Sequence, residues 1–248
     1  MGQFSLEMYF LLSMPAFFIG LSRGGLGGGF ALAAAIISAQ IFEPIKAAAF
    51  LLPLLIISDP LSVWIYRKNI YWNSIKILLP GILLGVVITF FLINKISSAM
   101  ISIIVGFLAI VLAIDGLTRK LVKAPKKKLH PIIGIFLGTI GGFSSFVIHS
   151  GLPPIAAYLL PLNLTRQKFM GTVALIFAIT NIIKLFPYFL LGLFDKELVK
   201  LTLILIPITF LGIFIGKLVN NKISDQIFFF IIYSSVFFLG LRLIWYSI

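Results

Sequence analysis

The run Asn94-Lys95-Ile96-Ser97 is repeated letter for letter as Asn221-Lys222-Ile223-Ser224, 127 positions further along the chain. The same offset relates a second set of residues. Pro80, Leu84 and Gly85 correspond to Pro207, Leu211 and Gly212, Pro60 to Pro187, and Phe42 to Phe169. A shared offset without gaps predicts two structurally similar halves, 1–118 and 131–248, joined by a linker at 119–130. In membrane transporters built this way, the substrate site lies where the repeats meet.

The composition places the chain in a membrane. Of its 248 residues, 60% are hydrophobic and only 11% are charged, whereas soluble domains carry roughly 25% charged residues. Stretches such as 75–93, 98–117 and 198–218 are continuously apolar over the length that a membrane-spanning helix needs. They do not alternate as the strands of a membrane barrel do. We therefore predict an all-α integral membrane protein.

The net charge of +13 does not indicate a nucleic-acid surface, because the basic residues lie in short loops, where membrane topology collects them. The chain has no cysteine, which excludes disulfides and thiolate metal ligands. No metal-binding or cofactor motif is present. We expect no metal, no cofactor and no nucleic-acid partner.

The apolar pattern indicates five helical segments in each half. The first two of each half are short and rich in Gly, Ser or Pro, so they form either a re-entrant hairpin or two short crossings. Either option gives an odd number of crossings per half, which predicts inverted repeats; a four-plus-four arrangement would give parallel ones. The segments span 6–21, 25–40, 45–64, 75–93 and 98–117, then 131–147, 151–162, 166–185, 198–218 and 224–247.

The distribution of Lys and Arg predicts an orientation. With the 119–130 linker in the cytoplasm, 13 basic residues face that side and 6 face the other, with Arg23 between them, and such a bias favours this placement. Both termini are then outside a bacterial-type inner membrane. The 13 are Arg67, Lys68, Lys76, Arg119, Lys120, Lys123, Lys126, Lys127, Lys128, Arg166, Lys168, Lys217 and Lys222; the 6 are Lys46, Lys95, Lys184, Lys196, Lys200 and Arg242.

A glycine-rich stretch at 20–30 is the first candidate site. Six glycines in eleven residues are costly in a helix, at about 1 kcal/mol each relative to alanine. One interpretation is close helix packing. The other is a helix broken near Gly24, whose second part presents free N–H groups and a positive dipole end to an anion. Arg23 beside the break either binds that anion or extends to the membrane surface.

The matching stretch of the second half is 141–154. It contains the polar side chains of Ser144, Ser145, His149 and Ser150, followed by Gly151 and a proline pair. Proline is well tolerated at a helix start, so a helix is expected to begin again at Pro153 with a second anion-seeking end. Serines often bond to carbonyls of their own helix, and a single histidine often lies satisfied in a core, so each residue also has a structural interpretation.

Three other polar residues lie within apolar segments. Asp59 can relay a proton, pair with Arg23, or cap the turn that Ser-Asp-Pro favours. Asn181 and Lys184 lie one turn apart on the segment of the second half that corresponds to the Asp59 segment. Lys184 either contacts an anion or extends to the membrane surface.

Two signatures resemble the TauE/SafE sulfite exporter family. The first is Gly20-Leu-Ser-Arg-Gly-Gly-Leu-Gly-Gly-Gly29, followed by Leu52-Pro53-Leu54, Ser58-Asp59-Pro60 and Trp64-Ile65-Tyr66-Arg67. The second runs from Gly151-Leu152-Pro153-Pro154 and Tyr158-Leu159 to Lys168–Thr172, Asn181, Lys184-Leu185 and Tyr188. The sequence departs from the family at His149-Ser150-Gly151 and at Met170, both near the predicted site. The resemblance implies transport of sulfite or of organosulfonates such as sulfoacetate.

These observations predict a secondary transporter of small sulfur-containing anions with alternating access and no catalytic residues. A passive anion channel and a membrane-embedded enzyme are the alternatives. H⁺ and Na⁺ are the candidate coupling ions, and a homodimer is one option for the assembly. The expected anion-binding residues are Arg23, Gly24, Gly25, Gly27, Gly28, Ser144, Ser145, His149, Ser150 and Gly151, with Asp59, Tyr158, Asn181 and Lys184 in supporting or coupling roles.

Overall fold

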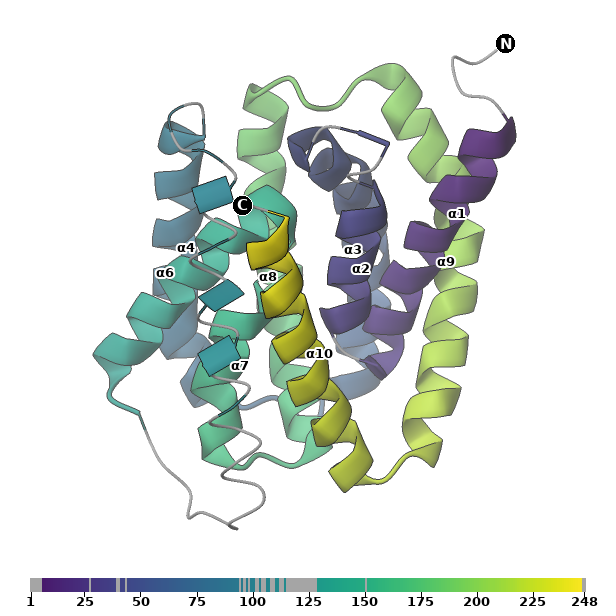
Figure 1. The fold of residues 1–248 in the computed structure, drawn as a ribbon. Helices are drawn as coiled ribbons and strands as arrows, with labels where there is room; N and C mark the ends of the chain where they lie inside the picture. Colours follow the sequence, from purple (N-terminus) through teal and green to yellow (C-terminus); the bar gives the residue numbers. More distant parts are fainter. Residues whose placement is uncertain are drawn as a thin grey trace.

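The computed structural model describes residues 6–26, 28–38, 41–42, 44–93, 95, 97, 99–100, 103, 106–107, 110–111, 114, 129–149 and 151–246. Most of the predicted segment 98–117 and of the linker 119–130 lies outside these residues. The first half contains α1 (Leu6–Leu21), the π-helical turn η1 (Ser22–Leu26), α2 (Gly28–Ser38), α3 (Pro44–Tyr66) and α4 (Trp72–Leu92) (Figure 1). The second contains α6 (Pro131–Ile148), α7 (Leu152–Leu159), the 3-10 turn η2 (Leu160–Leu162), α8 (Arg166–Leu190), α9 (Lys196–Lys222) and α10 (Asp225–Trp245).

The described residues form helices and no strand. Six of the described helical stretches are long and apolar enough to cross a membrane by length and composition. Large apolar side chains such as Phe91, Phe186 and Phe214 are well exposed, as expected where lipid rather than water surrounds the helices. The prediction of an all-helical multi-pass membrane protein is confirmed.

Each half begins with a helical hairpin. α1 ends in the π-turn η1, where Gly25 has φ 116°, a backbone conformation that glycine adopts without the penalty of a side chain. The rings of Phe18 and Phe30 meet across this hairpin, with centroids 5.7 Å apart. The expectation that the second part starts near Gly24 is wrong: α2 begins at Gly28, because the π-turn lengthens the break. In the second half, α6 ends at left-handed His149 (φ 52°) and α7 begins at Leu152, one residue before the expected Pro153.

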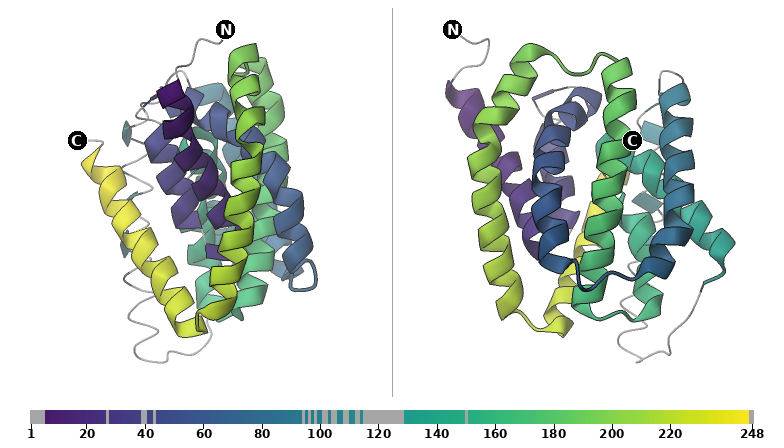
Figure 2. Two further views of the ribbon diagram at one scale, coloured as in Figure 1. Left: turned by 90° about the vertical axis from the view of Figure 1, so that its right-hand side faces the viewer. Right: turned by 180° about the vertical axis from the view of Figure 1, so that it is seen from behind.

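The tightest helix pairs join the two halves. α1 lies along α9, and a methyl group on Gly20 or Gly212 would overlap the other helix's backbone. α4 lies along α6 in the same way, through Gly85 and Gly142. Figure 2 shows α9 beside α1 along its length. Small residues allow membrane helices to approach this closely. The main core cluster likewise mixes the halves, with Phe50 packed together with Phe146 and Leu201. We refer below to the α1–α9 and α4–α6 contacts as the glycine seams.

The gapless register of 127 is wrong for the first three helices of each half. The hydroxyl of Tyr66 donates to the carbonyl oxygen of Gly24 (3.3 Å), and that of Tyr188 donates to the carbonyl oxygen of Phe146. Tyr188 lies 122 positions after Tyr66, and Phe146 lies 122 positions after Gly24. The equivalent of Pro60 is therefore residue 182, not Pro187.

The fourth helices keep the offset of 127. Gly85 in α4 packs against the carbonyl oxygen of Thr139, and Gly212 in α9 packs against that of Phe17. The five additional residues flank the turn between α8 and α9, because this turn (191–195) and the α3–α4 turn (67–71) are equally long. α3 ends at Tyr66, whereas α8 continues two residues beyond the equivalent Tyr188. α4 begins at Trp72, whereas α9 begins three residues before the equivalent Val199.

The equivalent helices α3 and α8 run in opposite directions. Asn181 in α8 bonds to Asp59 in α3. Gly171, ten residues earlier in α8, packs against the carbonyl oxygen of Asn69, which lies ten residues after Asp59. Antiparallel packing of equivalent helices places a pseudo-twofold axis between Asp59 and Asn181, near the middle of the molecule.

Candidate functional site

A small cavity lies where the two hairpins meet α3 and α8. Its volume of about 20 Å³ is room for roughly one water molecule. Two pairs of its lining residues are 122 positions apart: Arg23 with Ser145, and Leu55 with Phe177. The cavity therefore surrounds the pseudo-twofold axis. The lining residues are Arg23, Ala31, Leu55, Ser145, His149, Leu152, Phe177 and Asn181.

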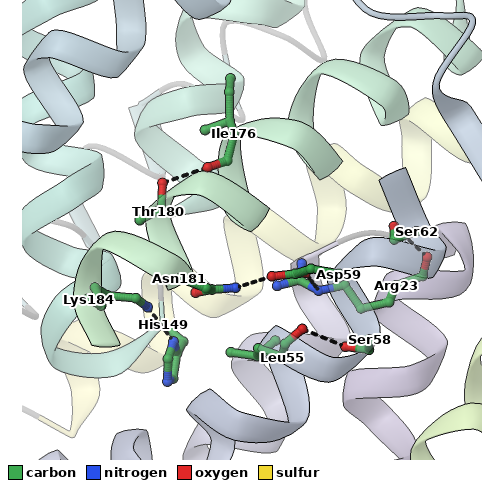
Figure 3. Close-up of polar contacts among 10 residues, drawn as sticks. All are labelled: Arg23, Leu55, Ser58, Asp59, Ser62, His149, Ile176, Thr180, Asn181 and Lys184. Carbon is green, nitrogen blue, oxygen red and sulfur yellow. Dashed lines mark hydrogen bonds and ion pairs between the residues drawn. The ribbon is translucent and has the colours of Figure 1, made fainter. Parts of the chain in front are cut away.

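Arg23, Asp59 and Asn181 form a buried chain across the axis (Figure 3). Arg23 Nε and Asp59 Oδ1 form an ion pair at 2.7 Å, but the geometry between these two atoms is not that of a hydrogen bond. Asn181 Nδ2 donates to the other carboxylate oxygen, Oδ2, at 2.7 Å. The guanidinium also lies over the ring of Phe177, 5.5 Å from its centroid. Arg23 therefore does not extend to the membrane surface. Asp59 does not cap a turn, because α3 continues through it to Tyr66.

Lys184 is fully buried and bonded only to neutral groups. Its Nζ lies 3.0 Å from the carbonyl oxygen of Ser145, 3.2 Å from Ser145 Oγ and 2.9 Å from His149 Nδ1. An ammonium has three N–H donors and no acceptor, so these three partners match its three hydrogens. His149 Nε2 lies 2.9 Å from the carbonyl oxygen of Ala48, in α3. A carbonyl only accepts, so Nε2 carries a hydrogen and Nδ1 of the neutral ring accepts from Lys184.

The charges of this cluster do not cancel. With Arg23 and Lys184 protonated, Asp59 ionised and His149 neutral, the cluster carries a formal charge of +1. The one ion pair among the described residues here joins Asp59 to Arg23, so Lys184 has no counter-ion in the part of the chain that the structure describes. A buried charge without a partner is costly and marks a functional site in a membrane protein.

The two halves hold their hairpins by the same contacts with different side chains. Ser62 Oγ donates to the carbonyl oxygen of Arg23 at 2.9 Å. Its counterpart Lys184, 122 positions later, donates to the carbonyl oxygen of Ser145, the counterpart of Arg23. Asp59 and Asn181 are also counterparts and bond to each other on the axis. The basic residue of the cluster thus lies on the hairpin in the first half, as Arg23, and on the third helix in the second half, as Lys184.

Several residues that the sequence suggests lie away from the cavity. Gly24 packs against the backbone of α9, and Gly25 against Tyr66 and Asn220. Ser144 donates to carbonyl oxygens of its own helix, those of Ile140 and Gly141.

Of the remaining suggested residues, Tyr158 packs against Gly134, and Gly151 against Ser145 and Phe177. Gly28 begins α2. Gly27 and Ser150 lie outside the described residues. The structure therefore brings together Arg23, Asp59, Ser145, His149, Asn181 and Lys184 from the suggested set.

Sequence reasoning missed Leu55, Phe177 and Ser62. An offset of 122 would have indicated all three. It aligns Leu55 with Phe177 and Ser62 with Lys184 as equivalent positions, and it is supported by the identical pairs Ser22 and Ser144, and Tyr66 and Tyr188. The identical residues of the fourth helices concealed this second register.

Comparison with known proteins gives one match. The family model described as sulfite exporter TauE/SafE matches residues 12–243, nearly the whole chain. A search of curated proteins and a search of solved structures each found no match. Among the described residues, no group of three or more His, Cys, Asp or Glu side chains is placed to hold a metal ion. With a family match of this extent, six long apolar helices and a buried polar cluster between its halves, the chain belongs to the TauE/SafE sulfite exporter family of membrane transporters.

Proposed function

We propose that this protein is a secondary transporter of a small sulfur-containing anion, sulfite or an organosulfonate such as sulfoacetate, which binds in the cavity on the pseudo-twofold axis. The observation that carries the proposal is the fully buried side chain of Lys184, whose Nζ has no ion-pair partner among the described residues. Moving a cation from water into the interior of the protein costs free energy unless an opposite charge is buried beside it. A bound anion supplies that charge.

The groups around the cavity suit an oxyanion. Arg23 and Asn181 line the cavity and carry N–H donors. Lys184 does not line the cavity but is hydrogen-bonded to Ser145 and His149, which do. Hydrogen bonds between ionised groups and oxyanion oxygens are short and strong. The apolar walls formed by Leu55 and Phe177 lower the polarity of the cavity, which strengthens each of these interactions. No metal or cofactor is needed for such a site.

A cavity of about 20 Å³ is too small for a sulfur oxyanion, so binding requires the cavity to widen. The hairpin turns at Ser22–Leu26 and at His149 depart from regular α-helix on either side of the cavity. We propose that they shift during alternating access, with the repeats inverted in the membrane and the 119–130 linker in the cytoplasm.

A passive anion channel built from the same groups is the second candidate. Purified protein in proteoliposomes separates the two. A transporter shows saturable flux and counterflow, in which unlabelled sulfite outside drives labelled sulfite uphill. Flux proportional to concentration without counterflow would contradict the proposal. A thermal-shift screen with sulfite, thiosulfate, sulfate, sulfoacetate and taurine identifies the preferred anion.

Lys184→Met tests the observation that carries the proposal. Replacing Lys184 by methionine removes hydrogen-bond donors and the group that can carry a positive charge, so we expect the affinity for the anion to fall at least about tenfold, the equivalent of one charged hydrogen bond. The anion-induced thermal shift and the flux at low anion concentration should decrease with it. Lys200→Met is the matched control, because Lys200 lies exposed on α9. Equal flux in both variants would remove Lys184 from the site.

A further inference from the structure

The contact between Lys184 and His149 has a consequence for the ion that accompanies the anion. The two nitrogens, Lys184 Nζ and His149 Nδ1, lie 2.9 Å apart, and both residues are buried. At this distance one hydrogen lies between them. The pair is therefore a single basic centre that shares one proton, whichever nitrogen holds it.

The surroundings keep the pair at one proton while the cavity is empty. The nearest described ionised groups are Arg23 from η1 and Asp59 from α3, and these neutralise each other as an ion pair. α7 and α2, which complete the walls, contain no charged residue. The carbonyl of Ala48 fixes the other ring nitrogen as a donor. A second proton would create two adjacent cations in a site where the residues described by the structure offer no further anion.

An anion in the cavity reverses this balance. It enters next to His149 and Arg23, both of which line the cavity, and its negative charge stabilises a second positive charge on the pair. The added proton comes from water and binds His149 Nδ1. Lys184 keeps its own three hydrogens and its two bonds to Ser145, and the hydrogen that pointed to His149 becomes free.

We propose that Lys184 and His149 form a proton-binding site that holds one proton when the cavity is empty and takes a second when the anion enters, so that a proton travels with each anion. This inference rests on the proposed function, because it requires an anion in this cavity. It selects H⁺ over Na⁺ as the coupling ion. The two groups that would take up the positive charge are the nitrogen bases Lys184 Nζ and His149 Nδ1, and nitrogen bases bind H⁺ in preference to Na⁺.

The first test measures protons directly. Isothermal titration of the parent protein with the anion selected by the screen is repeated in buffers of different ionisation enthalpy. We expect net uptake of up to about one proton per anion bound, and an affinity that rises up to about tenfold for each unit of decrease in pH. If the anion is sulfite, its own ionisation is measured separately and subtracted. Binding without proton exchange overturns the inference and leaves the proposed function intact; absence of binding by any probe contradicts the proposed function itself.

The second test uses the two histidines of the chain. His149→Gln keeps an acceptor for Lys184 and a donor for Ala48 but removes the titrating ring, so binding should persist while proton uptake and the pH slope disappear. His130→Gln is the matched control, because His130 caps the start of α6 through its Nδ1 and lies away from the cavity. Uptake that persists in His149→Gln would place the proton on another group, with Asp59 the first candidate, and would overturn the inference.

A third measurement needs no variant at the site. Nitrogen-15 spectra of histidine-labelled protein distinguish the neutral Nε2–H form from the imidazolium, and His130→Gln assigns the two rings. We expect His149 to be neutral without the anion and to become imidazolium when the anion binds. A His149 signal that remains neutral in the saturated complex overturns the inference, even if His149→Gln does not fold.

Discussion

The two halves of the molecule place the same backbone contacts around the cavity and fill them with different chemistry. In the first half, the hairpin carries Arg23, and the third helix carries Asp59 and Ser62. In the second half, the equivalent positions are Ser145, Asn181 and Lys184. The carbonyls of the hairpin accept equivalent hydrogen bonds in both halves. The scaffold is therefore duplicated, whereas its ionisable residues are divided: the first half holds an ion pair, and the second holds a basic residue with no ion-pair partner among the described residues.

The largest expected difference between the halves concerns Asp59 and its counterpart Asn181. Asp59→Ala leaves Arg23 as a buried charge without a partner, and we expect a loss of about 3–5 kcal/mol in the free energy of unfolding. Asn181→Ala removes one hydrogen bond to a carboxylate, with an expected loss of about 1.5–3 kcal/mol. Reversible unfolding in mixed micelles measures both values. The double variant Arg23→Met with Asp59→Leu should recover much of the first loss, and equal losses in the two single variants would contradict the division of charge.

The glycine seams should respond alike, because they belong to the duplicated scaffold. A methyl group at Gly85 overlaps the backbone of α6, and one at Gly212 overlaps the backbone of α1. Overpacking of this kind costs about 1–3 kcal/mol, so Gly85→Ala and Gly212→Ala should lower the thermal midpoint by similar amounts. Leu84→Ala is the control, since Leu84 is half exposed beside Gly85. A large effect in one seam and none in the other would show that the halves differ in packing as well as in charge.

The smallest expected difference separates the two tyrosines. Tyr188→Phe loses one hydrogen bond, to the carbonyl of Phe146. Tyr66→Phe loses the bond to Gly24 and also the acceptor of Asn220 Nδ2, which lies 3.0 Å from the hydroxyl. One additional hydrogen bond corresponds to about 1 kcal/mol, so Tyr66→Phe should be the more destabilising variant in the same unfolding assay. The opposite order would contradict the observed role of Asn220.

Much of this architecture was predictable from local signals. Helix starts and ends followed from prolines, glycines and polar loops, and the predicted 166–185 segment fell short of the real end at Leu190 because Pro187 suggests a stop. The site was predictable in part. A charge at Arg23 or Lys184 within apolar sequence marks function by its cost alone, but its partner is set by tertiary packing, so the alternatives for Asp59 stayed open.

The register of the repeat was the main error, and its cause is physical. Pro80 and Gly85 in α4, and the Asn-Lys-Ile-Ser run that follows this helix in the sequence, are conspicuous, and their copies give an offset of 127. The contacts that build the cavity follow 122, because α8 is two residues longer at its end, and α9 three residues longer at its start, than the equivalent ends of α3 and α4. Hydrogen bonds to carbonyls depend on position rather than on side-chain identity, so Ser62 and Lys184 share a role that no sequence match shows.

The glycine seams also constrain how the protein is made. Translation delivers α1 first, but its partner α9 begins at Lys196, after most of the chain has left the ribosome. Until then the glycine face of α1 has no helix packed against it. The glycine face of α4 likewise has no partner until α6, which begins at Pro131, has been synthesised. A nascent chain stopped after the first half therefore lacks both partners and presents two unfilled grooves to the lipid. The α4–α6 seam can therefore form once α6 has been inserted, whereas the α1–α9 seam must wait for α9, which follows α7 and α8.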